Sequence, residues 1–374
     1  MIDSVVLQLN KGDYTICENN KLEGVRAQQG KGFIVNSKYC KDFADKMKKD
    51  GLYFPVITLP RSKSGKKEIK EFLEIQVSLP KLVYGSNIYE IDYSDLDNIL
   101  NKLLICLKQI GIETNKENLK NATLKRVDFS KIILLPEYLG TSKQVIKKLA
   151  EFNYKPSSDF DLKEYNNNSD GITIKFYNKT QGYAIYDKFG EIINNGYTLF
   201  EKDIIKALED KRLKKNVIKF EFAHQRKQSL EAFLRKRIKT KSQGFTLPDV
   251  LQDKNIAKDI LLEIFDKVYS PATQALITLS EMQENRLEQY LRDKNLPLKK
   301  RAFISYLVNK ATKIGAKGLF EELREDLSGG SYDRLKKEIS LILVELGDIS
   351  QDLPNLLQYL RAKHDEFKII KPES

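Results

Sequence analysis

The sequence of 374 residues contains no tryptophan, only two histidines and only three cysteines. Cys17, Cys40 and Cys106 are too scattered to form a metal-binding cluster or a disulfide framework, which fits a reducing compartment. His224 and His364 exclude a His-x-His pair supplemented by a third histidine, so a zinc site built on histidine is disfavoured. Any metal ion would therefore need oxygen ligands.

Long hydrophobic runs are also missing. The opening MIDSVVLQL has no basic start, no long apolar stretch and no small-residue cleavage site. No run approaches the length that is needed to span a membrane. The sequence therefore predicts a cytoplasmic protein that is neither exported nor embedded in a membrane.

Basic residues are abundant: 64 Lys and Arg stand against 52 Asp and Glu, giving a formal net charge of +12. Such a balance attracts polyanions, so nucleic acid is the leading partner. A lysine-rich surface that only reflects an AT-rich genome is the alternative. A hydrophobic content of 41%, with 18 Tyr and 18 Phe, predicts a globular protein of two or three domains.

Residues 1–245 are expected to form an α+β domain around an antiparallel sheet, because β-runs alternate irregularly with helical patterns. We expect strands at 2–8, 52–59, 71–79, 121–135 and 217–225, and a hairpin formed by ITIKFYN and YAIYDK. We expect helices at 37–49, 94–111, 142–152, 198–213 and 228–240. The basic segment 61–70 resembles a hairpin tip, and 155–170 a polar loop.

Residues 246–374 lack β signals and are expected to form a second, all-helical module that binds DNA or has an accessory role. The pieces 299–314, 317–326 and 330–346 have lengths that suit a helix-turn-helix unit, and a plain helical bundle is the alternative. Within 330–341, the residues that would reach a DNA groove are Ser331, Arg334 and Lys337.

Three carboxylates, Glu74, Asp128 and Glu221, lie within β-runs and have apolar or aromatic neighbours. Acidic groups in that setting need partners. Carboxylates on neighbouring strands would suit a hard ion such as Mg²⁺ or Mn²⁺, which could polarise a phosphate as a Lewis acid. Ion pairs with Arg126 or with surrounding lysines are the alternative.

Tyr186 and Lys188 are two residues apart in YAIYDK, so on a strand a phenol and an ammonium would project from one face. A phenol titrates near pH 10, so it needs a metal or base near its oxygen and a cation to stabilise developing charge. With 18 tyrosines in the chain, a role at the edge of the core is the alternative for any one of them.

Residues 211–241 carry twelve Lys or Arg. The densest part consists of Arg235, Lys236, Arg237, Lys239 and Lys241. Contact with the DNA backbone is the natural use of this stretch, and a solubilising helix face is the alternative.

Five segments, in this order, resemble the gene II-type replication initiators of filamentous phages, which are relatives of the rolling-circle plasmid initiators with a Rep_trans-type domain. The segments are MIDSVVLQL, EIQVSLPKLVYGSNIY, RVDFS, YDKFGE and KFEFAHQR. The S-x-P-K and G-x-N pattern and the Tyr-x-Lys pattern are the most specific parts. The resemblance spans roughly residues 1–245.

The resemblance implies an HUH-like nicking domain that cleaves one strand of single-stranded or hairpin origin DNA and stays attached through a 5′-phosphotyrosine. Host helicase and polymerase would then extend the free 3′-hydroxyl. Carried over residue by residue, the nucleophile falls on Tyr186, with Lys188 as its cationic neighbour and Tyr177 in reserve. The acidic positions fall on Glu74, Asp128 and Glu221. The expected DNA-binding residues are Arg126, Arg226, Arg235, Lys236, Arg237 and Arg334.

One departure from the phage pattern is the presence of Ala223 and Gln225, where the family has a further Arg and Glu. Two other functions remain open. A DNA-binding regulator of the same fold would have lost nicking, although retention of Tyr186, Lys188 and the three acids disfavours it. A tyrosine recombinase would need an Arg and His set that the sequence lacks. The replicon, whether phage, plasmid or integrated element, and the oligomeric state stay open.

Overall fold

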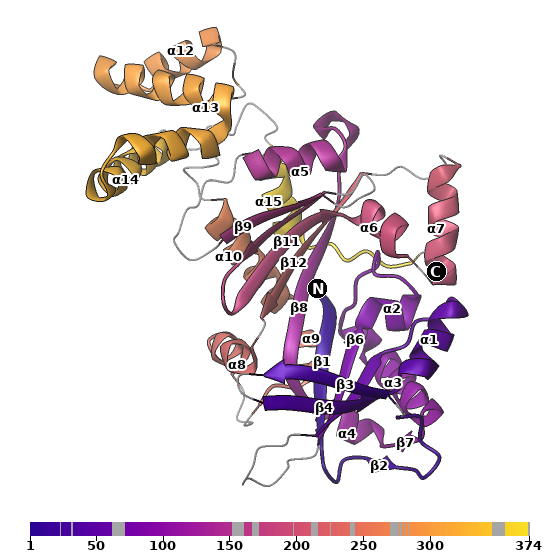
Figure 1. Ribbon diagram of the computed structural model, residues 1–374. Helices are drawn as coiled ribbons and strands as arrows, with labels where there is room; N and C mark the ends of the chain where they lie inside the picture. Colours follow the sequence, from indigo (N-terminus) through magenta and orange to yellow (C-terminus); the bar gives the residue numbers. More distant parts are fainter. Residues whose placement is uncertain are drawn as a thin grey trace.

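The protein is described from a computed structural model (Figure 1). The described residues are 1–22, 24–30, 33–61, 72–151, 161–166, 172–196, 198–210, 216–224, 226–239, 244–269, 276, 279–280, 282, 284–345 and 356–372. Most of the predicted hairpin tip at 61–70 lies outside them. Every helix among these residues is too short or too polar to span a membrane.

A sheet that has ten strands in the described part of the chain organises the molecule, and all of its neighbouring strands pair antiparallel. Its order is β3 (Gly24–Gly30), β4 (Phe33–Tyr39), β5 (Val56–Arg61), β6 (Phe72–Ser78), β1 (Ile2–Asn10), β8 (Thr123–Leu134), β12 (Val217–His224), β11 (Gln181–Asp187), β10 (Ile172–Tyr177) and β9 (Asp161–Asn166). The short strands β2 (Thr15–Ile16) and β7 (Ile112–Glu113) pair separately. The predicted α+β class with an antiparallel sheet and C-terminal helices is confirmed.

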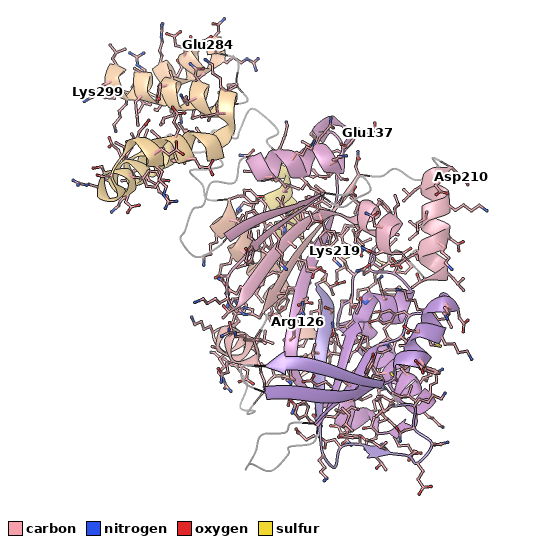
Figure 2. All side chains as sticks on the ribbon, in the orientation of Figure 1. Arg126, Glu137, Asp210, Lys219, Glu284 and Lys299 are labelled. Atoms are coloured by element: carbon pink, nitrogen blue, oxygen red, sulfur yellow. The ribbon has the colours of Figure 1, made fainter. Side chains whose placement is uncertain are left out.

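Helices surround this sheet and continue beyond it. The helices within the first 235 residues are α1 (Lys41–Lys49), α2 (Leu79–Tyr84), α3 (Leu96–Gln109), α4 (Lys116–Lys120), α5 (Ser142–Glu151), α6 (Lys188–Asn195), α7 (Leu199–Glu209) and α8 (Lys227–Arg235). The later helices are α9 (Leu247–Leu251), α10 (Lys254–Val268), α12 (Glu284–Asp293), α13 (Leu298–Asp326), α14 (Gly329–Glu345) and α15 (Leu356–Glu366). Helices α12 to α14 stand apart from the sheet, and Figure 2 shows Glu284 and Lys299 there, far from Lys219.

The central strands have one apolar face and one polar face because side chains alternate along each strand. On β1, Val5, Leu7 and Leu9 are buried, whereas Ser4 and Gln8 are half-buried. The side that we call the polar face carries the pairs that the register sets opposite each other: Ser4 with Asp128, Ser130 with Glu221, and Tyr186 with Lys219.

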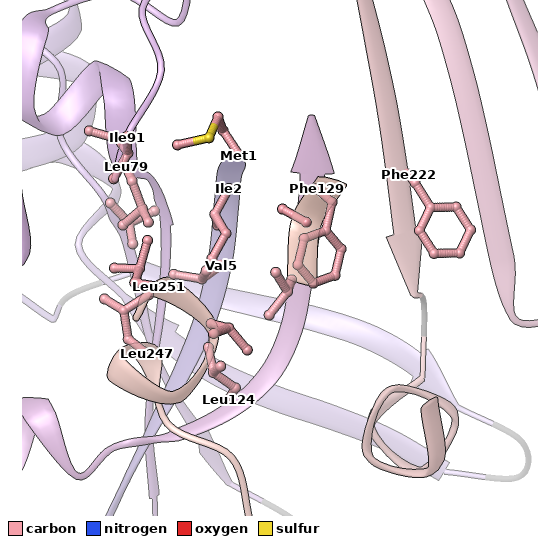
Figure 3. Close-up of a cluster of buried hydrophobic side chains, with 14 of the residues drawn as sticks. Met1, Ile2, Val5, Leu79, Ile91, Leu124, Phe129, Phe222, Leu247 and Leu251 are labelled. Carbon is pink, nitrogen blue, oxygen red and sulfur yellow. The ribbon is translucent and has the colours of Figure 1, made fainter. Parts of the chain in front are cut away.

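The apolar face packs on helices that follow the last strand in the sequence. Phe220 on β12 belongs to the same buried cluster as Phe265 of α10 and Leu360 of α15. Figure 3 shows Leu247 and Leu251 of α9 in the cluster that also contains residues of β1 and β8. The predicted boundary at residue 245 therefore falls inside the first core, because α9, α10 and α15 cover the sheet.

A second core holds α12, α13 and α14 together. Its buried residues are all leucine, isoleucine, valine, alanine or phenylalanine, and they run from Leu276 to Leu343. The described elements thus form a sheet domain that ends with α10 and resumes with α15, and a helical module between them. A third, smaller cluster lies under α6 and α7 and includes Phe189, Ile192 and Ile204.

Candidate active site on the central sheet

The polar face of β8, β12 and β11 gathers ionisable side chains at the middle of the sheet. Tyr186 is the sixth residue of β11, and its backbone pairs with Lys219 on β12. Glu221 lies two residues further along β12, so it shares the face with Tyr186. Strand alternation and register alone bring the predicted nucleophile and one predicted acid together.

A hydrogen bond joins these two groups: Tyr186 Oη donates to Glu221 Oε2 over 3.0 Å. Both side chains are half-buried. Burial, together with the negative charge of Asp3, raises the pKa of Glu221 to about 7. Burial and the neighbouring Glu221 also raise the pKa of Tyr186 well above its ordinary value, so the phenol is neutral and acts as the donor.

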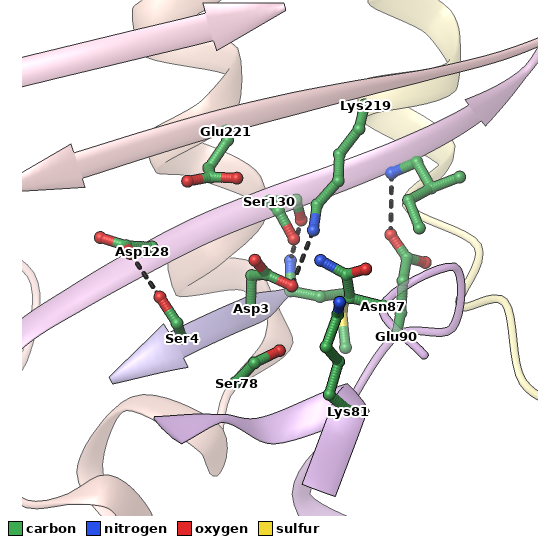
Figure 4. Close-up of polar contacts among 12 residues, drawn as sticks. Asp3, Ser4, Ser78, Lys81, Asn87, Glu90, Asp128, Ser130, Lys219 and Glu221 are labelled. Carbon is green, nitrogen blue, oxygen red and sulfur yellow. Dashed lines mark hydrogen bonds and ion pairs between the residues drawn. The ribbon is translucent and has the colours of Figure 1, made fainter. Parts of the chain in front are cut away.

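Asp3 and Lys219 form a second pair beside the first, and the sequence reading did not single out either residue. Lys219 Nζ lies 2.7 Å from Asp3 Oδ1, and the lysine side chain is 1% exposed. Burial alone would lower the pKa of Lys219, but the carboxylates of Asp3 and Glu221 outweigh it and raise the pKa. Figure 4 shows Lys219 reaching Asp3, with Glu221 on the same side of the strands.

Asp128 lies on β8, next to β1 and β12, and is held by two donors. Ser4 Oγ donates to Asp128 Oδ2, and Arg126 Nε donates to Asp128 Oδ1 over 2.8 Å. Burial raises the pKa of Asp128, although Arg126 and Ser4 oppose the rise. The alternative of an ion pair between Asp128 and Arg126 is therefore realised in the structure.

Glu74 lies away from the other two predicted metal ligands. On β6 it pairs with Gln8, four residues along β1 from Ser4, the partner of Asp128. That separation along a strand is about 13 Å. Glu74 also forms an ion pair with Lys125. The structure does not bring the three carboxylates together, and among the described residues no group of three His, Cys, Asp or Glu could hold a metal ion.

Lys188 does not extend the strand as the sequence indicated. It is the first residue of α6, because Asp187 caps that helix by accepting a hydrogen bond from the Phe189 amide over 3.2 Å. The ammonium of Lys188 lies 6.0 Å from the ring centroid of Tyr186. Lys188 is fully buried, and this burial lowers its pKa although Glu191 opposes the effect.

The segment with the S-x-P-K and G-x-N patterns contacts Lys188 through its asparagine. Lys188 Nζ donates to Asn87 Oδ1 over 2.6 Å, and it also pairs with Glu191. Asn87 is the asparagine of the G-x-N pattern. Lys81, the lysine of the S-x-P-K pattern, lies 2.9 Å from the fully buried Glu201. Segments that are distant in sequence therefore converge beside Tyr186.

Tyr177, the reserve nucleophile, lies at the far end of β10. Its backbone pairs with Gly182, whereas Tyr186 pairs with Thr173. Four residues along a strand separate Thr173 from Tyr177, which is about 13 Å. The structure therefore places Tyr177 on the same sheet as Glu221 but does not bring it to that carboxylate.

The predicted DNA-binding residues are divided among several surfaces. Arg126 is in the site, and its side chain is 41% exposed. Helix α8 packs Leu230 and Leu234 on the apolar face, so its basic residues border the side of the sheet opposite Tyr186. Among the predicted residues, Arg226, Arg235, Lys236 and Arg334 on α14 are exposed, and so is the neighbouring Lys239. Arg237 instead stacks 3.8 Å from the Phe233 ring centroid and pairs with Glu263.

The chain was compared with family models, with curated proteins and with solved structures. The chain matches no protein-family model and no curated protein. It is structurally similar to the rolling circle replication initiator protein from Geobacillus stearothermophilus, with a TM-score of 0.29 and 9% sequence identity over 72% of this chain and 84% of that chain. At this identity and TM-score, the function has to be argued from the side chains of the site.

Proposed function

We propose that the chain is a rolling-circle replication initiator that nicks and joins single-stranded DNA through Tyr186, on an HUH-like domain. The observation that carries this proposal is the hydrogen bond from Tyr186 to Glu221, with the buried ammonium groups of Lys188 and Lys219 close by. This arrangement supplies what a phenol needs before it can attack: a proton acceptor at its oxygen and positive charge around it.

In the proposed reaction, Tyr186 Oη attacks the phosphorus of the scissile phosphodiester and gives its proton to Glu221. The bond between phosphorus and the O3′ of the preceding nucleotide breaks, and this leaving oxygen takes a proton from water. The product is a 5′-phosphotyrosine and a free 3′-hydroxyl. Because one phosphodiester replaces another, the reverse attack by a 3′-hydroxyl joins strands with no further energy source.

The steps above use only groups of the chain and water, and the divalent ion expected from the sequence, Mg²⁺ or Mn²⁺, stays a prediction. Glu74, Asp128 and Glu221 do not form a ligand set in the described structure, so their arrangement does not fit the predicted centre. Each of the three is engaged with a protein donor: Lys125, Arg126 and Tyr186, respectively.

The partners proposed with this function are single-stranded or hairpin origin DNA and the host helicase and polymerase. The net charge of +12 favours contact with phosphates. Arg126, partly exposed beside Asp128, is the cation through which we expect the scissile strand to be held at the site.

The test is formation of a covalent protein–DNA adduct by purified protein and single-stranded oligonucleotides from the replicon's origin, with Mn²⁺ and with a chelator in its place. We expect an adduct with wild type and with Tyr177→Phe, and none with Tyr186→Phe, which removes one oxygen from a half-buried site. Loss with Tyr177→Phe instead would move the nucleophile to β10. Binding of the oligonucleotide by wild type without any adduct would favour the regulator.

A further inference from the structure

The helical module has an uneven charge distribution along α13. Between residues 294 and 320 the chain has no Asp or Glu, and it carries Lys294, Lys299, Lys300, Arg301, Lys310, Lys313 and Lys317. The acidic residues Glu321, Glu322, Glu325 and Asp326 follow directly. The part of α13 before its kink at Gly315 is therefore basic, and acidic residues begin at Glu321, beyond the kink.

The part of α13 before the kink has a well-defined inner and outer side. Its inner side enters the second core through Ile304, Leu307, Val308 and Ala311. On the outer side, residues spaced by three or four positions are all exposed: Lys299, Ala302, Tyr306, Asn309 and Lys313. We call these five residues the outer face of α13. Tyr306 is 52% exposed there, so its ring lies at the surface of the module.

The outer face of α13 carries residue types that contact the phosphates and base edges of duplex DNA. A lysine at each end can contact phosphates of the two strands that border a groove. Asn309 has the amide that pairs with the major-groove edge of adenine, and Ala302 lets the helix backbone approach closely. The segment of 298–314 is about 25 Å long at the rise of an α-helix, and the major groove admits one helix.

Helix α14, which the sequence reading favoured for this role, has a mixed exposed side. Its exposed residues include Arg334 and Lys337, but also Asp333, Glu338 and Leu341, which is 56% exposed. Carboxylates on a helix that enters a groove would be repelled by the phosphates on both sides. The charge pattern therefore favours α13 over α14.

We propose that the outer face of α13 binds duplex DNA in the major groove and recognises sequence there, apart from the strand-cleavage site. The inference rests on the proposed function, because it assigns to the helical module the recognition of origin duplex. The module has its own core, and Figure 2 shows Lys299 at its outer edge, far from Arg126 and Lys219 on the sheet. Binding and cleavage therefore use different surfaces.

The experiment compares two double variants of the full chain that each remove two positive charges from exposed positions of the same module. Lys299→Ala with Lys313→Ala alters the outer face of α13, and Arg334→Ala with Lys337→Ala alters α14 as the matched control. Binding to a short labelled duplex of unrelated sequence is measured over a range of salt concentrations. A second measurement selects preferred sequences from a random duplex library with wild type, Asn309→Ala and the control.

We expect the α13 double variant to weaken duplex binding and to lower the slope of log affinity against log salt by about 2, whereas the α14 variant leaves both close to wild type. We expect Asn309→Ala to lose about tenfold or more in discrimination at one base pair of the selected sequence. Equal behaviour of the two double variants, or the larger loss in the α14 variant, would overturn the proposal.

Adduct formation on a single-stranded oligonucleotide separates this inference from the proposed function. The α13 variants should form the adduct at the wild-type rate, because Tyr186 and Glu221 are untouched. If wild type forms no adduct but the α13 variants still lose duplex binding, the face is a DNA-binding surface and the nicking function fails. If the adduct forms and duplex binding is unchanged, only the surface is misassigned.

Discussion

At the scale of single residues, the site depends on how three carboxylates on adjacent strands are compensated. Asp3 pairs with the ammonium of Lys219, and Asp128 pairs with the guanidinium of Arg126. Glu221 accepts its hydrogen bond from a neutral phenol. A carboxylate in that position has the pKa, about 7, that suits the transfer of a proton near neutral pH.

Two glutamates that the sequence placed in one role should therefore behave differently on substitution. We expect Glu221→Gln to slow adduct formation by about 10² to 10⁴, because the amide cannot take the phenolic proton. We expect Glu74→Gln to stay within a few-fold of wild type, since Glu74 pairs with Lys125 away from Tyr186. Single-turnover kinetics with an oligonucleotide measures both. Similar losses in the two variants would argue for a shared metal centre after all.

His364 provides a residue-scale prediction about pH. Burial lowers its pKa to about 4, from 6.5 in an exposed histidine. Because the folded pKa lies below the unfolded one, the unfolded chain takes up the proton first as the pH falls. The contribution of His364 to the free energy of unfolding is fully present above pH 6.5 and declines towards pH 4. At pH 5 the loss is about 2 kcal/mol.

Urea unfolding at pH 8 and pH 5 would measure this loss. His364→Gln should flatten the decline in unfolding free energy by that amount, whatever its effect on stability at pH 8. His224, whose pKa is also lowered to about 4 by burial and by Arg237, leaves a residual slope in the same direction. If His364→Gln and wild type lose the same free energy of unfolding between pH 8 and pH 5, the imidazole of His364 is hydrated in the folded state.

The sequence reveals site residues that belong to short local patterns, but not those that depend on pairing between distant strands. Strand alternation places Glu221 on the face of β12 that borders Tyr186, and both were named from short patterns. Asp3 and Lys219 were missed because their pairing needs β1 and β12 to lie on either side of β8, together with an irregular register between Ile2 and Ser4. Neither feature leaves a trace in a local window of sequence.

At the scale of elements, segment 86–91 links the site to the last described residues of the chain. Glu90 is 2% exposed and pairs with the buried Lys131 at 2.8 Å. The amide of Ile370 donates to Glu90 Oε2 over 3.0 Å, and the amide of Glu90 donates to the carbonyl of Ile370 over 2.8 Å. The same segment carries Asn87, which holds Lys188 beside Tyr186.

The pair of Glu90 and Lys131 should accordingly be among the costly contacts to break. We expect Glu90→Gln to lower the free energy of unfolding by about 3 to 5 kcal/mol, because it leaves the Lys131 ammonium buried without its carboxylate. The matched control is Lys371→Ala, which breaks ion pairs of 3.0 Å to Asp92 and Asp95, directly after that segment. Because the ammonium of Lys371 is partly exposed, this change should lower the free energy of unfolding by about 1 kcal/mol or less. Denaturant unfolding that gives equal losses would contradict the distinction.

Element boundaries show where sequence patterns reach and where they do not. The hairpin of β10 and β11 and the helix at α3 follow from alternation and from an apolar stripe, respectively. The polar segment predicted as a loop at 155–170 contains β9, an edge strand whose pairing with β10 makes up for its polar composition. The sequence predicted Lys188 on a strand because it follows the alternating run that contains Tyr186. The strand ends at Asp187, which caps α6, and a local sequence pattern does not show this turn of the backbone.

At the scale of the whole molecule, the described residues have two large hydrophobic clusters. Helices α10 and α15 lie side by side on the sheet and are joined by an ion pair between Arg361 and Asp266 at 2.8 Å. The helical module of α12 to α14 lies between them in the sequence and has its own core. A shift in composition at residue 245 marks the end of the strands, but it does not mark the end of the first core.

This arrangement predicts two unfolding transitions, which a matched pair of core substitutions would separate. Leu103 on α3 is 0% exposed and belongs to the first core, whereas Leu307 on α13 is 1% exposed and belongs to the second. Replacing either with alanine removes the same groups and should cost about 2 to 5 kcal/mol.

Differential scanning calorimetry of the full chain would distinguish the two units. We expect Leu307→Ala to lower the midpoint of one transition by about 10 °C or more and to leave the other in place. Leu103→Ala should do the reverse, with a smaller shift of about 5 °C or more because the sheet domain is larger. Below both transitions, Leu307→Ala should still form the adduct through Tyr186, because the site lies on the sheet. A single transition that both substitutions shift would mean that the module unfolds together with the sheet, and that changes on α13 reach the tyrosine through one cooperative structure.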